Sequence, residues 1–176
     1  MTRPYVNPGE YRLVKARLIL AELKKQRVTH VVGVPDNGSR ALFEQLFADA
    51  DIELILASRE GEVFAIAAGL WLGGAHPAAL IQNTGFLEAG DAFRGTVYNM
   101  AIPLVMLIGY RGYNTMQPGA PRVDTDATFF EPTLKAWDIP YTLLFDDKDV
   151  PQIPAAFAKV EETSMPAAVV LVEETT

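Results

Sequence analysis

Short, uninterrupted apolar runs separated by longer helical patterns constrain the fold of this chain more than any other feature. A run that is apolar at nearly every position, instead of every second one, is typical of a strand covered on both faces. The six runs occupy residues 31–34, 52–56, 78–81, 104–108, 141–144 and 168–172. Helical patterns cover residues 10–26, 39–48, 62–73, 88–100, 126–137 and 150–162. This alternation predicts an α/β fold, namely a doubly wound, mostly parallel six-stranded sheet with helices on both faces.

The length of 176 residues, with 49% hydrophobic residues, fits one domain with one substantial core. We expect an N-terminal arm over residues 1–9 and a single domain over residues 10–176. Residues 109–122 form a loop rich in glycine and proline that follows a strand. Open α/β sheets bind ligands outside the carboxyl ends of their strands, so this loop is a candidate lid.

Composition excludes several classes of function. The chain has no cysteine and only two histidines, which argues against thiolate catalysis and a transition-metal site. Its net charge of −7 argues against a nucleic-acid partner. No apolar run reaches the roughly 20 residues of a membrane helix, and the N-terminus lacks the apolar region of a signal peptide, so we expect a cytoplasmic protein without a membrane partner.

Polar turns follow three of the predicted strands. In the first turn, Asp36 and Asn37 offer polar contacts to a ligand, although Asn37 or Ser39 would also serve as a helix cap. In the third, Gln82, Asn83 and Thr84 supply amide and hydroxyl groups, with turn-making and capping as the alternative. We expect the three turns to converge on a single cleft.

The second turn, Ala57 to Glu62, sets Arg59, Glu60 and Glu62 before an uncharged segment over residues 63–72. One interpretation is that the glutamates are ordinary first-turn acids, which the helix dipole stabilises. The other starts from the apolar helix, which we expect to be buried on nearly every side. A partly desolvated carboxylate at its mouth would hold a proton more tightly, as a proton-transfer residue must.

Four motifs in a fixed order are similar to those of a known family. They are Gly33-Val34-Pro35, then Arg59-Glu60-Gly61-Glu62 with Ala65 to Gly69, then Gln82-Asn83-Thr84-Gly85, then Ile102-Pro103-Leu104 with Ile108 to Gly112. This order resembles the pyrimidine-binding domain of thiamine diphosphate-dependent decarboxylases. Within that family it is most similar to the branch of the phosphonopyruvate decarboxylases and the sulfopyruvate decarboxylase alpha subunits, over about residues 10–172.

The resemblance implies a role for Glu60, which lies nine residues before Gly69. In the family, this glutamate bonds N1′ of the aminopyrimidine of thiamine diphosphate and thereby helps to remove the proton from C2 of the thiazolium. Pro35, Asn83 and Thr84 are the further cofactor contacts that it implies. Glu62 stays a first-turn acid.

The resemblance also implies a partner chain. The family's Gly-Asp-Gly motif, which with a later asparagine holds Mg²⁺ and the diphosphate, is absent. We therefore expect a diphosphate-binding beta subunit that holds most of the Mg²⁺ site, an active site shared between the two chains, and an α₂β₂ or larger assembly.

The implied substrate is a small anionic 2-oxo acid, sulfopyruvate first and phosphonopyruvate second, with decarboxylation or carboligation as the outcome. Arg94 and Arg111 would suit its anionic group, and Asp36, Asn37 and Arg59 are further candidates for contact. Relatives commonly carry His or Asn where this chain has Arg59. An arginine that pointed at Glu60 would work against the proton transfer that the resemblance implies, so we expect Arg59 to point towards substrate or a partner chain. They also continue with Leu-Gly-Asn where this chain has Phe86-Leu87-Glu88.

Two other classes stay open. The departure at Arg59 favours a non-catalytic binding or regulatory module with the same fold. A nucleotide-binding domain is the second alternative, although neither a G-x-G-x-x-G fingerprint nor a P-loop occurs.

Overall fold

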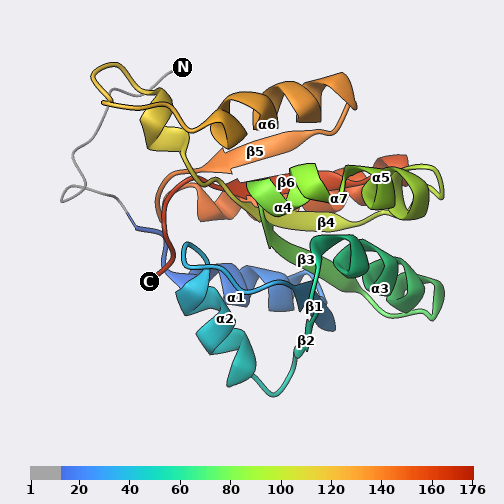
Figure 1. Cartoon of the computed structure of the whole chain (residues 1–176). Coiled ribbons are helices and arrows are strands. Elements are labelled where there is room, and N and C mark those ends of the chain that lie inside the picture. Colours follow the sequence, from blue (N-terminus) through green and yellow to red (C-terminus); the bar gives the residue numbers. More distant parts are fainter. Residues whose placement is uncertain (1–12) are drawn as a thin grey trace.

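The six strands form one sheet in which every strand runs parallel to its neighbours (Figure 1). This is seen in a computed structural model, which describes residues 13–176; the predicted arm over residues 1–9 lies outside them. The strands are β1 (His30–Gly33), β2 (Glu53–Leu56), β3 (Pro77–Gln82), β4 (Val105–Gly109), β5 (Tyr141–Leu144) and β6 (Ala167–Leu171), in the order β2-β1-β3-β4-β6-β5. Each lies within one residue of its predicted bounds, and the predicted fold class is confirmed.

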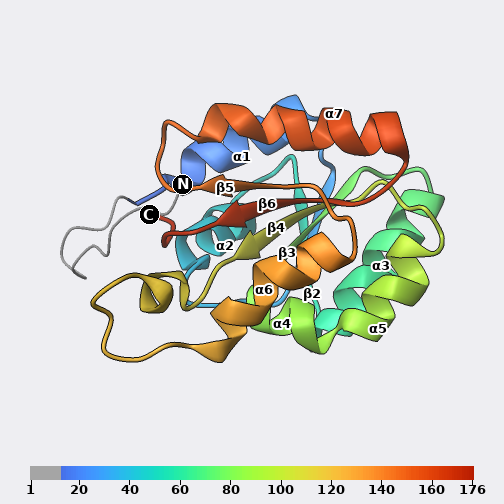
Figure 2. The same ribbon diagram turned by 90° about the horizontal axis from the view of Figure 1, so that it is seen from above.

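The helices cover both faces of the sheet (Figure 2). One face carries α1 (Ala16–Lys25), α2 (Arg40–Phe47) and α7 (Ile153–Thr163); the other carries α3 (Glu60–Leu72), α4 (Asn83–Glu88), α5 (Gly90–Phe93) and α6 (Thr125–Ala136). A π-helical turn, η1 (Arg94–Tyr98), and two 3₁₀ turns, η2 (Tyr113–Met116) and η3 (Val150–Gln152), complete the elements.

The continuous apolar runs follow from this layering. Successive residues of a strand point to opposite faces, so Val31 enters the core under α1 and α2 whereas Val32 enters the core under α3. Both faces are covered, and the positions within a central strand, between its ends, are therefore apolar. Gly33 ends β1 where a side chain would meet the Leu80 carbonyl oxygen of β3 at 2.5 Å.

Three predictions about helices are wrong. The first helix begins at Ala16, because Val14 instead pairs with Thr175 near the end of the chain. The helix predicted over residues 88–100 begins at Asn83 and is divided into α4, α5 and η1. Finally, α3 is not buried on nearly every side.

One side of α3 lies open in this chain. Val63, Phe64, Ala67 and Ala68 are buried against the sheet. On the opposite side Ala65, Gly69, Trp71 and Leu72 are exposed, Leu72 to 62%. The helix is therefore apolar on a face that nothing within residues 13–176 covers.

Candidate active site

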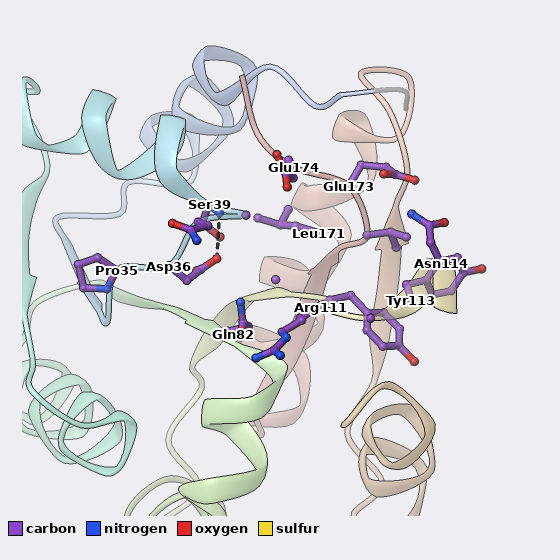
Figure 3. Close-up of a pocket in the computed structure, with 16 residues that line it drawn as sticks. Pro35, Asp36, Ser39, Gln82, Arg111, Tyr113, Asn114, Leu171, Glu173 and Glu174 are labelled. Atoms are coloured by element: carbon purple, nitrogen blue, oxygen red, sulfur yellow. Dashed lines mark hydrogen bonds between the residues drawn. The ribbon is translucent and has the colours of Figure 1, made fainter. Parts of the chain in front are cut away.

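A cavity of about 570 Å³ lies at the carboxyl ends of β1, β3, β4 and β6 (Figure 3). The turn after β1, Gln82 at the end of β3, the loop after β4 and the segment after β6 line it. The first and third polar turns therefore meet, as predicted. The second turn does not line the cavity, so the prediction that all three converge on a single cleft is wrong.

Asp36 organises the turn after β1. Its Oδ1 accepts a hydrogen bond from the backbone N–H of Ser39 at 3.1 Å, which closes the turn; Ser39 is the N-cap residue of α2, but its side chain forms no capping hydrogen bond. Asp36 Oδ2 and Ser39 Oγ are buried without a hydrogen-bond partner among the described residues. Pro35 and Asn37 are exposed and also line the cavity. This wall therefore presents acceptor groups.

Asn83 has a different role from the one we predicted. Its side chain is fully buried, and both ends of its amide are held by one residue of the loop after β4. Asn83 Nδ2 donates to the Arg111 carbonyl at 3.1 Å, and Asn83 Oδ1 accepts from the Arg111 N–H at 3.0 Å. These two hydrogen bonds therefore connect the end of β3 to the loop.

The loop over residues 109–122 is held at its start and exposed near its end. Besides the bonds to Asn83, Tyr113 packs inward within η2, and Thr115 Oγ1 accepts from the Asp124 N–H at 2.8 Å. Pro118, Gly119, Pro121 and Arg122 are exposed. If the loop acts as a lid, which stays a prediction, its second half is the part free to move.

Arg111 is the only candidate arginine that lines the cavity. Its side chain is 59% exposed, and its Nε lies 3.5 Å from Asp124 Oδ2. Arg94, by contrast, follows α5, pairs with Asp91 at 2.6 Å and lines a separate hollow beside Trp137. Arg94, which we predicted as a second contact for the anionic group of the substrate, therefore lies outside the cavity, because α4 and α5 carry the chain away from that edge of the sheet.

Glu60 is the first residue of α3 and is half-buried. Its carboxylate accepts no hydrogen bond and forms no ion pair with any of residues 13–176. The side chain lies directly over Gly85 of α4, where an added Cβ would be 2.2–2.4 Å from Glu60 Cγ, Cδ and Oε1. Thr84 lies one residue before this contact, and its hydroxyl donates to Gln82 Oε1 at 2.8 Å.

Glu62 caps α3, as its first-turn position predicted. Its Oε2 accepts from the backbone N–H groups of Ser58 at 3.0 Å and Arg59 at 3.3 Å. These bonds satisfy donors that precede the helix and fix the entry of the chain into it. The two glutamates of the turn thus differ. The Glu62 carboxylate is hydrogen-bonded to the backbone, whereas the Glu60 carboxylate has no hydrogen-bond or ion-pair partner among residues 13–176.

Arg59 forms an ion pair with Glu88 at the end of α4. The hydrogen bond within this pair and the negative charge of Glu88 raise the pKa of the Arg59 guanidinium. The charges of Glu62 and Glu60 also raise this pKa, by smaller amounts. The two positions at which the chain departs from the family pattern are thus partners in space. Sequence reasoning did not select Glu88, because its importance depends on how α3 and α4 pack together.

A second buried network anchors the start of the loop. Tyr110 donates to the Ala127 carbonyl at 3.0 Å and lies 3.2 Å from Glu131 Oε1, while Tyr141 donates to Glu131 Oε2 at 2.5 Å. Burial first, and then the Glu131 carboxylate, raises the pKa of Tyr110 and of Tyr141. These tyrosines therefore tie β4, β5 and α6 together as neutral donors.

Two features are absent among residues 13–176. No cluster of three or more His, Cys, Asp or Glu side chains in that range has the arrangement of a metal site. Among the helices of the same range, none combines the length and the apolar character that crossing a membrane requires.

Comparison with known proteins agrees with this arrangement. Residues 15–128 match the family model described as "Thiamine pyrophosphate enzyme, N-terminal TPP binding domain". Phosphonopyruvate decarboxylase of Streptomyces hygroscopicus is 32% identical over 100 residues, which are 57% of this chain and 25% of that protein. Sulfopyruvate decarboxylase subunit alpha of Methanocaldococcus jannaschii is 32% identical over 90 residues, 51% of this chain and 53% of that protein.

A solved structure shares the fold. The benzoylformate decarboxylase from Polynucleobacter necessarius superposes with a TM-score of 0.71 at 22% identity, over 90% of this chain and 30% of that one. The matches thus span from a quarter to about half of these two curated relatives. The family model covers well over half of the chain, and the chain accordingly belongs to the thiamine pyrophosphate enzymes, as their N-terminal TPP-binding domain.

Proposed function

We propose that this chain is the alpha subunit of a thiamine diphosphate-dependent 2-oxo acid decarboxylase that acts on a small anionic substrate such as sulfopyruvate. The observation that carries the proposal is the state of the Glu60 carboxylate. It has no hydrogen-bond or ion-pair partner among residues 13–176, and it lies half-buried over Gly85. A half-buried carboxylate without a partner is unfavourable unless a ligand supplies one.

The residues present fit the cofactor. Glu60 would accept and return a proton at N1′ of the aminopyrimidine, and Pro35 and Thr84 would contact the ring. When bound, thiamine diphosphate supplies an acidic carbon that adds to a 2-oxo acid and a ring that accepts the electrons released with CO₂. The diphosphate and Mg²⁺ would be held mainly by the partner, because the described residues offer no acidic cluster for the metal.

The substrate would lie in the cavity beside the cofactor. Arg111 would supply the positive charge of the cavity, because its side chain is 59% exposed although its Nε lies 3.5 Å from Asp124 Oδ2. A guanidinium suits the oxygens of sulfonate, phosphonate and carboxylate alike. Asp36 and Asn37 would contact the rest of the substrate. The Streptomyces relative favours phosphonopyruvate as the second candidate substrate.

A diphosphate-binding beta subunit is the proposed partner, in an α₂β₂ or larger assembly. The name of the Methanocaldococcus relative, an alpha subunit, supports a partner chain. So does the exposed apolar side of α3, which includes Trp71 and Leu72, because contiguous exposed apolar surface is typical of protein interfaces. We propose the cytoplasm as the location.

Calorimetric titration tests the proposal. Thiamine diphosphate with MgCl₂ is titrated into the chain alone and into the chain mixed with the product of the adjacent reading frame. We expect binding only in the mixture, and CO₂ release from sulfopyruvate there. Glu60→Gln should lower this activity by orders of magnitude. Glu44→Gln, a matched change at an exposed position of α2, should leave the activity intact.

Two results would contradict the proposal. If Glu60→Gln keeps full CO₂ release, Glu60 is not the proton-transfer residue. If a mixture that forms a stable complex binds no thiamine diphosphate, the chain is a non-catalytic module that has kept the fold.

A further inference from the structure

Gly85 is a buried glycine inside a helix, and its presence needs an explanation. Glycine destabilises a helix interior relative to alanine because it loses more backbone freedom on folding. It is tolerated where the backbone needs a positive φ, yet Gly85 is not among the positive-φ glycines, which are Gly74, Gly112 and Gly119. Backbone conformation therefore does not explain the glycine at this position, whereas the lack of room for a side chain does.

The space beside Gly85 is filled by Glu60. An alanine Cβ at position 85 would overlap the middle and the end of that side chain, at 2.2 Å from Cγ and 2.3 Å from Oε1. No other glycine among residues 13–176 comes as close to a side chain; the next is Gly112, whose added Cβ would lie 2.7 Å from Asp124. The Glu60 side chain thus lies across the backbone of α4.

We propose that Gly85 is a positioning residue for Glu60, because its missing side chain forms the recess in which the Glu60 carboxylate lies. Hydrogen bonds and ion pairs within residues 13–176 do not hold this carboxylate, so the recess determines its position. Ordinary contact begins near 3.4 Å, and an alanine would displace the carboxylate by about 1 Å. A shift of that size in a catalytic group lowers rates about a hundredfold. The importance of this shift for catalysis rests on the proposed function; the contact itself does not.

A double-mutant cycle on the chain alone tests the contact without cofactor or partner. Unfolding in urea is measured for wild type, Gly85→Ala, Glu60→Ala and the double variant. We expect Gly85→Ala to destabilise the wild type but to be neutral or stabilising beside Glu60→Ala, because truncation removes the overlapping atoms. The matched control is Gly95→Ala, whose Cβ would meet no atom within 4 Å; its effect should be the same in both backgrounds.

A spectroscopic measurement separates positioning from a purely structural role. In the isolated chain at one fixed pH, the NMR chemical shift of the Glu60 carboxyl carbon is compared between variants. We expect this chemical shift to change in Gly85→Ala and to stay in Gly95→Ala, since only the first substitution pushes the carboxylate out of the recess. Equal destabilisation by Gly85→Ala in both backgrounds, or an unchanged chemical shift, overturns the proposal.

The effect of Gly85→Ala on catalysis is measured in a separate experiment. In a mixture with the partner that releases CO₂, Gly85→Ala should lower kcat about a hundredfold, and unchanged kcat would overturn the catalytic part. If wild type releases no CO₂, the proposed function fails, while the unfolding cycle still decides whether Gly85 positions Glu60.

Discussion

Replacing Phe86 with alanine removes the centre of an aromatic cluster that joins the helices on one face of the sheet. Phe86 is fully buried on α4, beside the recess formed by Gly85. Its ring centroid lies 5.3–6.3 Å from the rings of Phe64, Phe93, Phe130 and Trp137, which come from α3, α5, α6 and the residue after α6. Among residues 13–176, no other aromatic ring forms ring contacts with all four.

The size of the effect follows from this packing. Phe→Ala substitutions in a core cost about 3–5 kcal/mol, because a cavity remains where the structure cannot collapse. Neighbouring rings on three helices restrict collapse here, so we expect a loss of about 4–5 kcal/mol, within that range. For a chain of this length, each kcal/mol lowers Tm by about 2–4 °C, which gives a fall of about 8–20 °C.

The assay is urea unfolding followed by circular dichroism and by the fluorescence of Trp137, which stacks on Phe93 at 5.6 Å. Phe129→Ala is the matched control, because this ring is 63% exposed on α6 and its loss should change stability by less than about 0.5 kcal/mol. A loss below about 2 kcal/mol for Phe86→Ala, or one no larger than the control's, would refute the assigned packing.

Three further outcomes are expected. Gly33→Ala should unfold the chain at lower urea concentration, because its Cβ would overlap a β3 carbonyl oxygen at 2.5 Å; unchanged unfolding would contradict this close approach of two strands. Asn83→Ala should speed tryptic cleavage in the loop after β4, because both hydrogen bonds to Arg111 are lost; cleavage at the wild-type rate would show that the loop is held elsewhere. Stability should fall as pH rises above about 10, because burial and a carboxylate of α6 raise the pKa of Tyr110, so the unfolded chain loses a proton that the folded chain keeps. Tyr110→Phe should weaken this alkaline dependence, and an identical pH profile would exclude Tyr110 as its source.

The sheet was predictable because both of its faces are covered. Central positions such as Val31 and Val32 must then both be apolar, and an uninterrupted apolar run is readable without knowledge of the partners. The helix after β3 was not predictable in the same way. Asn83 and Thr84 resemble turn residues, yet they begin α4, and this shift moved Arg94 out of the site.

The candidate site was predictable only as far as each residue acts by itself. The place before an apolar helix singled out Glu60 and Glu62 together, and the resemblance to the family then selected Glu60; Asp36 was identified from its turn. The Arg59–Glu88 ion pair and the recess at Gly85 depend on how α3 lies against α4. Sequence reasoning also treated α3 as buried on nearly every side, because apolar residues on an exposed face look the same in a sequence as residues that face a core.

The pairing of Arg59 with Glu88 has an evolutionary consequence. In the pattern that the chain resembles, His or Asn is common at the first position and Asn stands at the second, so a charge at either position alone would lack this counterpart. The two substitutions should therefore be inherited together, and lineages that carry an arginine at the first position should carry an acid at the second. Exchanging only one of these two residues between this chain and a relative would leave a charge without its counterpart. Exchanging both residues together would avoid this.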